Sequence, residues 1–234
     1  MGILQFFPVD KFYVSIDPRE FRPGQFCRIV VPHIDPIPRI LDVERSEPEE
    51  HRYVKFLLRN ANQTDDFIKK DRTLPIKNLN LESNEELLAR RAKKRPAIII
   101  SSDVDIFPHI EKILRQRGKK HCQEDCIFLI PCYHTEAEFD PRGFALEMIP
   151  RVRCLIYRQF FYLPEHPKIK ESVARFDRIQ VVVGRDLSSI KPLDFGLSED
   201  VLGVFKALFI YCLTGVEDKD LKSFRDLARE CYSE

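Results

Sequence analysis

Residues 95–101 read Arg-Pro-Ala-Ile-Ile-Ile-Ser, an apolar run rich in β-branched side chains between polar neighbours. Side chains of this kind favour strands, and a short run with polar flanks is typical of a strand buried in a sheet. Other apolar segments separated by turn signals have the same character, namely 25–31, 126–132, 152–163 and 172–183. The sequence therefore predicts a mainly β fold.

The clearest helix signal lies near the end of the sequence. Ser198 can cap a helix whose apolar residues recur at helical spacing, and Gly215 is a typical stop for it. A second amphipathic pattern follows. Shorter helices are expected at 110–117 and at 83–88, with a strand as the alternative at 83–88. Many short strands followed by terminal helices indicate a small β-barrel that carries helices.

Composition limits the classes of function. The 234 residues are 44% hydrophobic and 32% charged, which is typical of a globular chain. Lys and Arg number 38 against 37 Asp and Glu, so a nucleic-acid site would have to be a local patch. We expect no membrane segment, no secretory signal and, from seven cysteines without a disulfide spacing, a reduced cytoplasmic protein.

Four segments, taken in order, resemble the MazF/PemK family of small toxin endoribonucleases. They are Pro-Gly-Gln-Phe-Cys-Arg-Ile-Val at 23–30, Arg-Pro-Ala-Ile-Ile-Ile-Ser at 95–101, Ile-Phe-Leu-Ile-Pro-Cys at 127–132, and the strand and helix region 172–213. The second segment is close to the family signature Arg-Pro-x-ϕ-ϕ-ϕ-Ser, where ϕ is apolar. Together the four cover about a quarter of the chain.

The resemblance implies an SH3-like β-barrel of the MazF/PemK type with a C-terminal helix. Residues 1–234 would form one enlarged domain, with a long insertion at 33–94 between the first two core strands and an extension at 216–234. It also implies a metal-independent, sequence-selective endoribonuclease that cleaves single-stranded RNA without a cofactor, as the toxin of a type II toxin–antitoxin pair. The partners implied are RNA, a cognate antitoxin and a second copy in a homodimer.

Metal-free RNA cleavage needs a proton acceptor, a proton donor and cations that stabilise charge on the phosphate. Arg95 matches the Arg that begins the family's strand, and its guanidinium can bind two phosphate oxygens. Arg175 and Asp177 match an Arg-x-Asp pair that some members use as acid and base. Residues two apart on a strand share a face, so both could reach one phosphate. The alternative is an ordinary surface ion pair.

The segment after Pro131-Cys132 departs from the family. Many members have a Thr there that is catalytic or binds substrate, whereas this chain has Tyr133 and His134, with Thr135 one residue further. His134 could supply the missing proton carrier because an unperturbed His titrates near pH 6.5, although a solvated His is the simpler interpretation. Tyr133 and Thr135 are candidate substrate contacts.

Basic residues supply candidate contacts with the RNA backbone. Gln180 stands where the family has a strand Arg, and we count it with the substrate contacts. A first cluster contains Arg90, Arg91, Lys93 and Lys94, and a second spans 115–121. Both fit phosphate binding, and both could equally be solvated charges.

A metal site is not expected. The cysteines at 122, 126 and 132 have spacings unlike the C-x2-C pairs of zinc sites. Two alternatives to the nuclease remain: a nucleic-acid- or protein-binding module of the same fold without catalysis, and an unrelated β-rich interaction protein.

Overall fold

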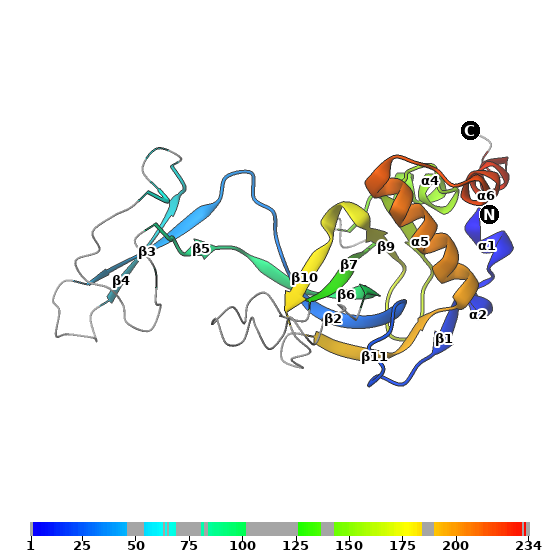
Figure 1. Ribbon diagram of the computed structural model, residues 1–234, viewed down its shortest axis with the longest axis horizontal. Helices are drawn as coiled ribbons and strands as arrows, with labels where there is room; N and C mark the ends of the chain where they lie inside the picture. The colour runs from blue at the N-terminus through cyan, green and yellow to red at the C-terminus, as the bar shows by residue number, and fades with distance from the viewer. Residues whose placement is uncertain are drawn as a thin grey trace, which may run out of the picture. The chain divides into compact units, whose positions relative to one another are not determined.

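The computed structural model describes residues 2–45, 54–62, 64, 66–68, 81, 84–101, 126–136, 143–183, 190–230 and 232. The chain forms two compact units (Figure 1). Unit 1 contains Met1–Val31 and Lys94–Glu234, and unit 2 contains Pro32–Lys93. Unit 2 thus covers almost the same residues as the expected insertion 33–94. That the whole chain is one enlarged domain stays a prediction.

Unit 1 is built on a sheet of eight described strands. Neighbouring strands follow the order β1-β11-β2-β6-β7-β9-β8, and β10 also pairs with β7. Each strand pair for which a register is defined is antiparallel. The strands are β1 Tyr13–Ser15, β2 Gln25–Pro32, β6 Ala92–Ser101, β7 Cys126–His134, β8 Phe160–Leu163, β9 Ser172–Arg175, β10 Gln180–Val183 and β11 Ile190–Leu197.

Of the residues that the structure describes, 40% lie in strands and 28% in helices, so this part of the chain is mainly β. This confirms the predicted class, and the strands expected at 25–31, 95–101 and 126–132 are confirmed as β2, β6 and β7. No closed barrel is found among the described strands, so the SH3-like barrel stays a prediction.

The strand expected at 172–183 is interrupted. β9 pairs with the end of β7, the 3-10 turn η4 Phe176–Arg178 follows, and β10 then pairs with the beginning of β7. The buried ring of Phe176 fills the break because it packs edge-on against Phe205 and Phe209. The turn therefore places Asp177 outside the ladder of strands.

The prediction of a strand at 152–163 is wrong for the first half of this range. Ile149–Arg153 form the helix α4, a turn follows in which Leu155 has φ of 51°, and only Phe160–Leu163 form a strand. Pro150 lies in the first turn of α4, where proline favours a helix. Ile149 and Val152 are three residues apart and both buried, so this short apolar run has helical rather than alternating periodicity.

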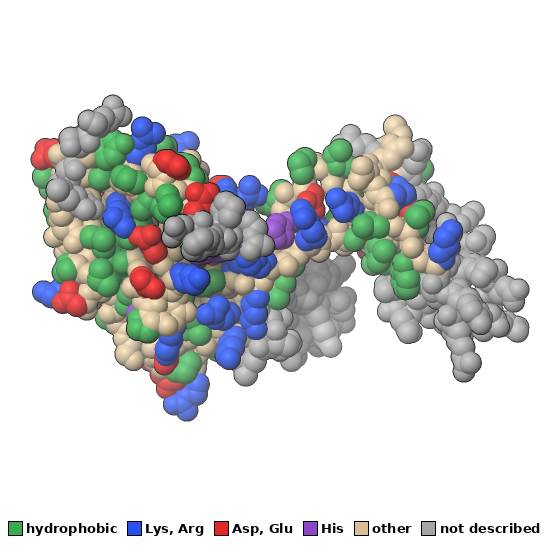
Figure 2. All heavy atoms as spheres, turned by 180° about the vertical axis from the view of Figure 1, so that it is seen from behind, with side chains coloured by type: hydrophobic (Ala, Val, Ile, Leu, Met, Phe, Trp, Pro, Cys, Tyr) green, Lys and Arg blue, Asp and Glu red, His purple; other side chains and the backbone are tan. Residues whose placement is uncertain are grey.

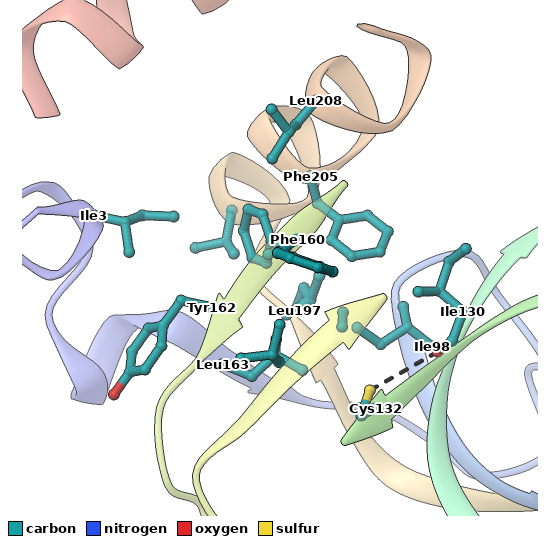
Figure 3. Packing of buried hydrophobic residues seen from close by; sticks show 14 of the residues in the cluster. Ile3, Ile98, Ile130, Cys132, Phe160, Tyr162, Leu163, Leu197, Phe205 and Leu208 are labelled. Atoms are coloured by element: carbon teal, nitrogen blue, oxygen red, sulfur yellow. Dashed lines mark hydrogen bonds between the residues drawn. The ribbon is translucent and has the colours of Figure 1, made fainter. Parts of the chain in front are cut away.

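The main core lies between one face of this sheet and the long helix α5 Glu199–Thr214 (Figure 3). The ring of Phe205 on α5 packs edge-on against that of Phe161 on β8, with centroids 5.1 Å apart. The other face of the sheet carries a second core, which contains Cys27, Ile29, Ala97, Ile99, Ile127 and Leu129.

The expected terminal helices are confirmed as α5 and α6 Lys219–Glu230. Gly215 ends α5 with φ of 73°, a left-handed conformation that favours glycine, and its N–H donates to the carbonyl of Tyr211. Ser198 precedes α5 in an extended conformation, but its side chain makes no capping hydrogen bond.

Three further short helices belong to unit 1. They are α1 Ile3–Phe6, α2 Val9–Phe12 and the 3-10 turn η3 Leu146–Met148. Ile3 and Phe12 are fully buried in the main core, so the segment before β2 is part of the fold.

Unit 2 contains a three-stranded antiparallel sheet in the order β4-β3-β5, formed by β3 Arg39–Arg45, β4 Val54–Asn60 and β5 Leu88–Ala89. Of the described residues in the segment 83–88, only Leu88 lies in a strand, where it pairs with Ile40, and residues 84–87 form neither a helix nor a strand. Arg59 joins Asp42 and the buried Asp66, with nitrogen–oxygen distances of 2.5 and 2.6 Å. The expected helix at 110–117 lies outside the described residues.

Candidate functional site

The aromatic ring of Tyr133 lies between two arginines that come from neighbouring strands. The guanidinium carbon of Arg95 on β6 is 4.2 Å from the ring centroid, and that of Arg175 on β9 is 5.2 Å from it. Cations over an aromatic face within about 6 Å are attracted by the ring quadrupole. Since β7 runs between β6 and β9, the two guanidinium groups approach the ring from opposite sides.

Strand register explains this arrangement. Ala97 pairs with Pro131, and continuing the antiparallel register by two residues brings Arg95 opposite Tyr133. On the other side Val173 pairs with Tyr133, and Arg175, two residues further, lies on the same face. The three side chains therefore share one face of the sheet, on which Ala97 belongs to the second core and Val173 to the main core.

Asp177 is bound by Arg175 in a two-point ion pair. Nε of Arg175 donates to Oδ1 at 3.0 Å and Nη2 donates to Oδ2 at 2.5 Å. Nε of Arg178 lies 3.5 Å from Oδ2 of the same carboxylate. The hydrogen bond to Asp177 raises the pKa of Arg175 above its ordinary value, although burial opposes it.

The site has an excess of positive charge. Two guanidinium groups, those of Arg175 and Arg178, lie beside the carboxylate of Asp177, and a third, that of Arg95, lies over the ring of Tyr133. Within the described part of the chain Arg95 has no acidic partner. The side chain of Asp177 is 37% exposed and that of Arg175 is 23% exposed, so a ligand can reach both. The arrangement is suited to an anion such as a phosphate.

A cluster of aromatic rings packs against the side chain of Arg175. Its guanidinium carbon is 5.6 Å from the ring centroid of Phe160, which β8 places directly opposite it. Phe160 in turn packs edge-on against Phe144 and Tyr157, at centroid distances of 5.0 and 5.9 Å. The side chain of Arg175 is therefore fixed by ring contacts and an ion pair before any ligand binds.

A polar network lies next to the site and was not found from the sequence. The carboxylate of Glu171 accepts hydrogen bonds from Arg153 at 2.6 Å, from Thr135 at 3.2 Å and from the hydroxyl of Tyr162. Burial alone would raise the pKa of Glu171, but the bonds from Tyr162 and Arg153 outweigh it and lower the pKa below its ordinary value. No motif marks these residues, because they come from α4, from β8 and from the ends of β7 and β9, which meet only in the folded chain.

The structure places the other predicted contacts less centrally. Thr135 donates its hydroxyl to Glu171, and Gln180 on β10 donates to the carbonyls of Arg178 and Ile179, which fixes the η4 turn. His134 alternates with Tyr133 along β7, so it lies on the opposite face of the sheet. The expected participation of His134 beside Tyr133 therefore has no support in the register.

The first basic cluster is divided between the two units. Lys94 belongs to unit 1, whereas Arg90, Arg91 and Lys93 belong to unit 2, and all four are exposed. Arg91 lies 3.5 Å from Asp35 within unit 2. The second basic cluster, 115–121, lies outside the described residues.

The described part of the chain contains no group of three or more His, Cys, Asp or Glu residues that could hold a metal ion. Its cysteines at 27, 126, 132, 154 and 212 are free thiols. Burial raises the pKa of Cys27 to about 12, so this thiol is not reactive. None of the described helices is both long and apolar enough to cross a membrane.

Comparison with known proteins gives no relative: no family model, no curated protein and no solved structure matches this chain.

Proposed function

We propose that unit 1 binds single-stranded RNA at the site formed by Arg95, Tyr133, Arg175 and Asp177 and cleaves it without a metal ion. The observation that carries this proposal is the pair of guanidinium groups on either side of Tyr133, one of them bound to a half-exposed carboxylate. This combines cationic donors and a proton acceptor within one site, which is what cleavage at a 2′-hydroxyl requires.

Each group has a definite role in this reaction. Asp177 accepts the proton of the 2′-hydroxyl, whose oxygen forms a bond to the neighbouring phosphorus. The bond from phosphorus to the 5′-oxygen breaks, and that oxygen takes a proton from water. Arg95 and Arg175 stabilise the charge that develops on the phosphate oxygens. The products are a 2′,3′-cyclic phosphate and a 5′-hydroxyl.

The remaining parts of the family resemblance belong to the same proposal. They are the SH3-like MazF/PemK barrel, sequence selectivity, the role of toxin with a cognate antitoxin, the homodimer and the cytoplasmic location. Their support is the order of the four matched segments, two of which supply Arg95 and the Arg175–Asp177 pair.

A second candidate is an RNA-binding module without catalysis. It is favoured by the position of Asp177, whose carboxylate is already engaged by Arg175 and faces Arg178. A carboxylate whose two oxygens already accept hydrogen bonds from Arg175 is less available to a 2′-hydroxyl. In this alternative the three arginines bind phosphates and Asp177 only orients them.

The test is incubation of the purified full chain with an end-labelled, mixed-sequence single-stranded RNA in the presence of EDTA. We expect fragments ending in a 2′,3′-cyclic phosphate, and no cleavage of the same sequence in 2′-deoxy form. Lys206→Ala, at an exposed position on α5, serves as the matched control for Arg95→Ala. Salt-dependent RNA binding without any cleavage would replace the nuclease by the binding module. Absence of both would overturn the proposal.

A further inference from the structure

Two basic residues stand directly opposite each other on the sheet of unit 1. Arg28 on β2 is the register partner of Lys191 on β11. Like charges at opposed positions of an antiparallel pair destabilise it. Neither residue has an acidic partner within the described part of the chain. An anion that bound between the two side chains would relieve this repulsion.

Arg28 is held in place by the loop that connects β8 to β9. Its Nη2 donates to the carbonyl of Lys168 at 3.1 Å, which uses one of the five N–H groups of the guanidinium. The ammonium group of Lys168 binds Asp194 of β11. Arg28 therefore lies between its register partner Lys191 and the backbone of Lys168, and Asp194, bound by Lys168, is the one carboxylate recorded in this group among the described residues.

The same loop is anchored to the main core. The hydroxyl of Tyr13 donates to the carbonyl of Pro164 at 2.7 Å. The ring of His166 stacks on Phe195 with centroids 4.0 Å apart. Because the loop is fixed at these points, the carbonyl that orients Arg28 is fixed too, and the guanidinium is arranged before a ligand binds.

This basic group is separate from the site around Tyr133. Arg28 shares a face of β2 with Phe26, which belongs to the main core, whereas Arg95 shares a face of β6 with Ala97, which belongs to the second core. The two groups therefore lie on opposite faces of one sheet. Lys and Arg side chains are also seen to gather over part of the surface of the larger body (Figure 2).

We infer that Arg28, Lys191 and Lys168 form a second binding site for phosphates of the RNA backbone, distinct from the site around Tyr133. The inference rests on the proposed function for the identity of the ligand. The site contacts phosphates that lie away from the scissile bond, so it contributes affinity and no sequence preference.

The experiment measures binding of a fluorescent mixed-sequence single-stranded RNA to the full chain over a series of salt concentrations. Each phosphate contact contributes about 0.7 to the slope of log K against log salt for single strands. Arg28→Gln with Lys191→Gln should therefore reduce the slope by about 1.4. The variant should remain folded, as a circular dichroism spectrum like that of the wild type would show, because the hydrogen bond lost with Arg28 is an exposed one and an unfavourable charge pair is removed with it. Lys11→Gln with Lys206→Gln, two exposed lysines elsewhere, is the matched control and should retain the slope.

The outcomes separate this inference from the proposed function. An unchanged slope in the Arg28/Lys191 variant, while Arg95→Gln weakens binding, overturns the second site and leaves the first intact. An equal loss in the control variant overturns it too, since general charge would then explain the effect. If inorganic phosphate raises the thermal midpoint of the wild type but not of the Arg28/Lys191 variant, and RNA binding is unchanged, the site binds free phosphate and the RNA assignment is wrong. A wild type that binds no RNA overturns both.

Discussion

The guanidinium carbon of Arg95 on β6 lies 4.2 Å from the ring centroid of Tyr133 on the neighbouring strand β7, although the two residues are far apart in the sequence. Arg175 reaches the same ring from the other neighbouring strand. Tyr133 is thus the common contact of two cations that would otherwise repel each other. The predictions below test what each member of this arrangement does.

Replacing Arg95 should reduce cleavage with little effect on folding. Removing one donor from a preorganised site typically costs 10² to 10³ in rate, and we expect this range for Arg95→Ala. Arg95→Lys should be nearly as slow, because the ammonium keeps the charge but loses the two-point fork. Single-turnover cleavage of labelled RNA measures the rate, and a thermal midpoint lowered by no more than about 4 °C, as expected from the loss of one cation–ring contact, shows that the fold is intact. A rate for Arg95→Lys equal to wild type would mean that charge alone matters.

The ring of Tyr133, rather than its hydroxyl, should be the structurally important part. Tyr133→Ala removes both cation–ring contacts, each of which contributes about 0.5 to 2 kcal/mol depending on exposure. We expect the free energy of unfolding in urea to fall by about 1 to 2 kcal/mol. Tyr133→Phe keeps the ring and should stay within about 0.5 kcal/mol of wild type. Equal losses in the two variants would contradict a role for the ring contacts.

Asp177→Asn should separate binding from catalysis. The change removes the carboxylate that lies beside the guanidinium groups of Arg175 and Arg178, so RNA affinity at moderate salt should rise. If Asp177 accepts the proton of the 2′-hydroxyl, the cleavage rate should fall by about 10² to 10⁴ at the same time. Asp10→Asn, at an exposed position of α2, is the matched control. Faster cleavage together with tighter binding would show that the base is another group.

The Glu171 network should make stability depend on pH in the acid range. The folded-state pKa of Glu171 lies below its ordinary value of 4.5, so the ionised carboxylate stabilises the fold above that pH. This contribution is lost as the pH falls from that value through the folded-state pKa. Unfolding free energies measured between pH 3 and 6 should therefore decline less steeply for Glu171→Gln than for wild type. Glu147→Gln, at an exposed position, should keep the wild-type slope.

Arg225 should be essential for the docking of α6. Its buried guanidinium donates to the carbonyls of Leu155 and Ile156, at 2.9 and 3.3 Å, and binds Glu217. A hydrogen bond to a charged group contributes about 1.5 to 3 kcal/mol, so Arg225→Met should lower the free energy of unfolding by about 2 to 3 kcal/mol. Lys222→Gln removes an exposed pair with Asp226 on the same helix and should cost about 0.5 kcal/mol or less.

Sequence periodicity correctly predicted the elements whose buried side chains follow one regular spacing. Strands β2, β6 and β7 carry uninterrupted apolar runs, and α5 carries apolar residues at helical spacing, so all four could be predicted. The same approach failed at 152–163 because a run of Val, Ile, Phe and Tyr is equally compatible with a turn of helix. The choice between helix and strand in this segment depends on Pro150 and on hydrogen bonds from Arg225. The bonds from Arg225 are long-range, so the local sequence does not reveal them.

The site was partly predictable for a similar reason. Arg95, Tyr133, Arg175 and Asp177 were proposed from sequence, and the structure brings them together, but their catalytic roles stay predictions. The orientation of His134 follows from alternation along β7 once the register of Tyr133 is known. Glu171 gave no signal in the sequence, because its partners Arg153 and Tyr162 come from segments that meet only in the folded chain.

Because β9 pairs with β7, the number of residues between Val173 and Arg175 matters more for the position of Arg175 than the identity of the residues in this segment. Val173 faces Tyr133, and Arg175 reaches the same ring only because it follows two positions later. Inserting or deleting one residue between them would turn Arg175 toward the opposite face of the sheet. Many side chains on β9 could be exchanged without that effect. The spacing of Arg175 and Asp177 from Val173 is therefore the feature by which a diverged chain with the same site should be recognised.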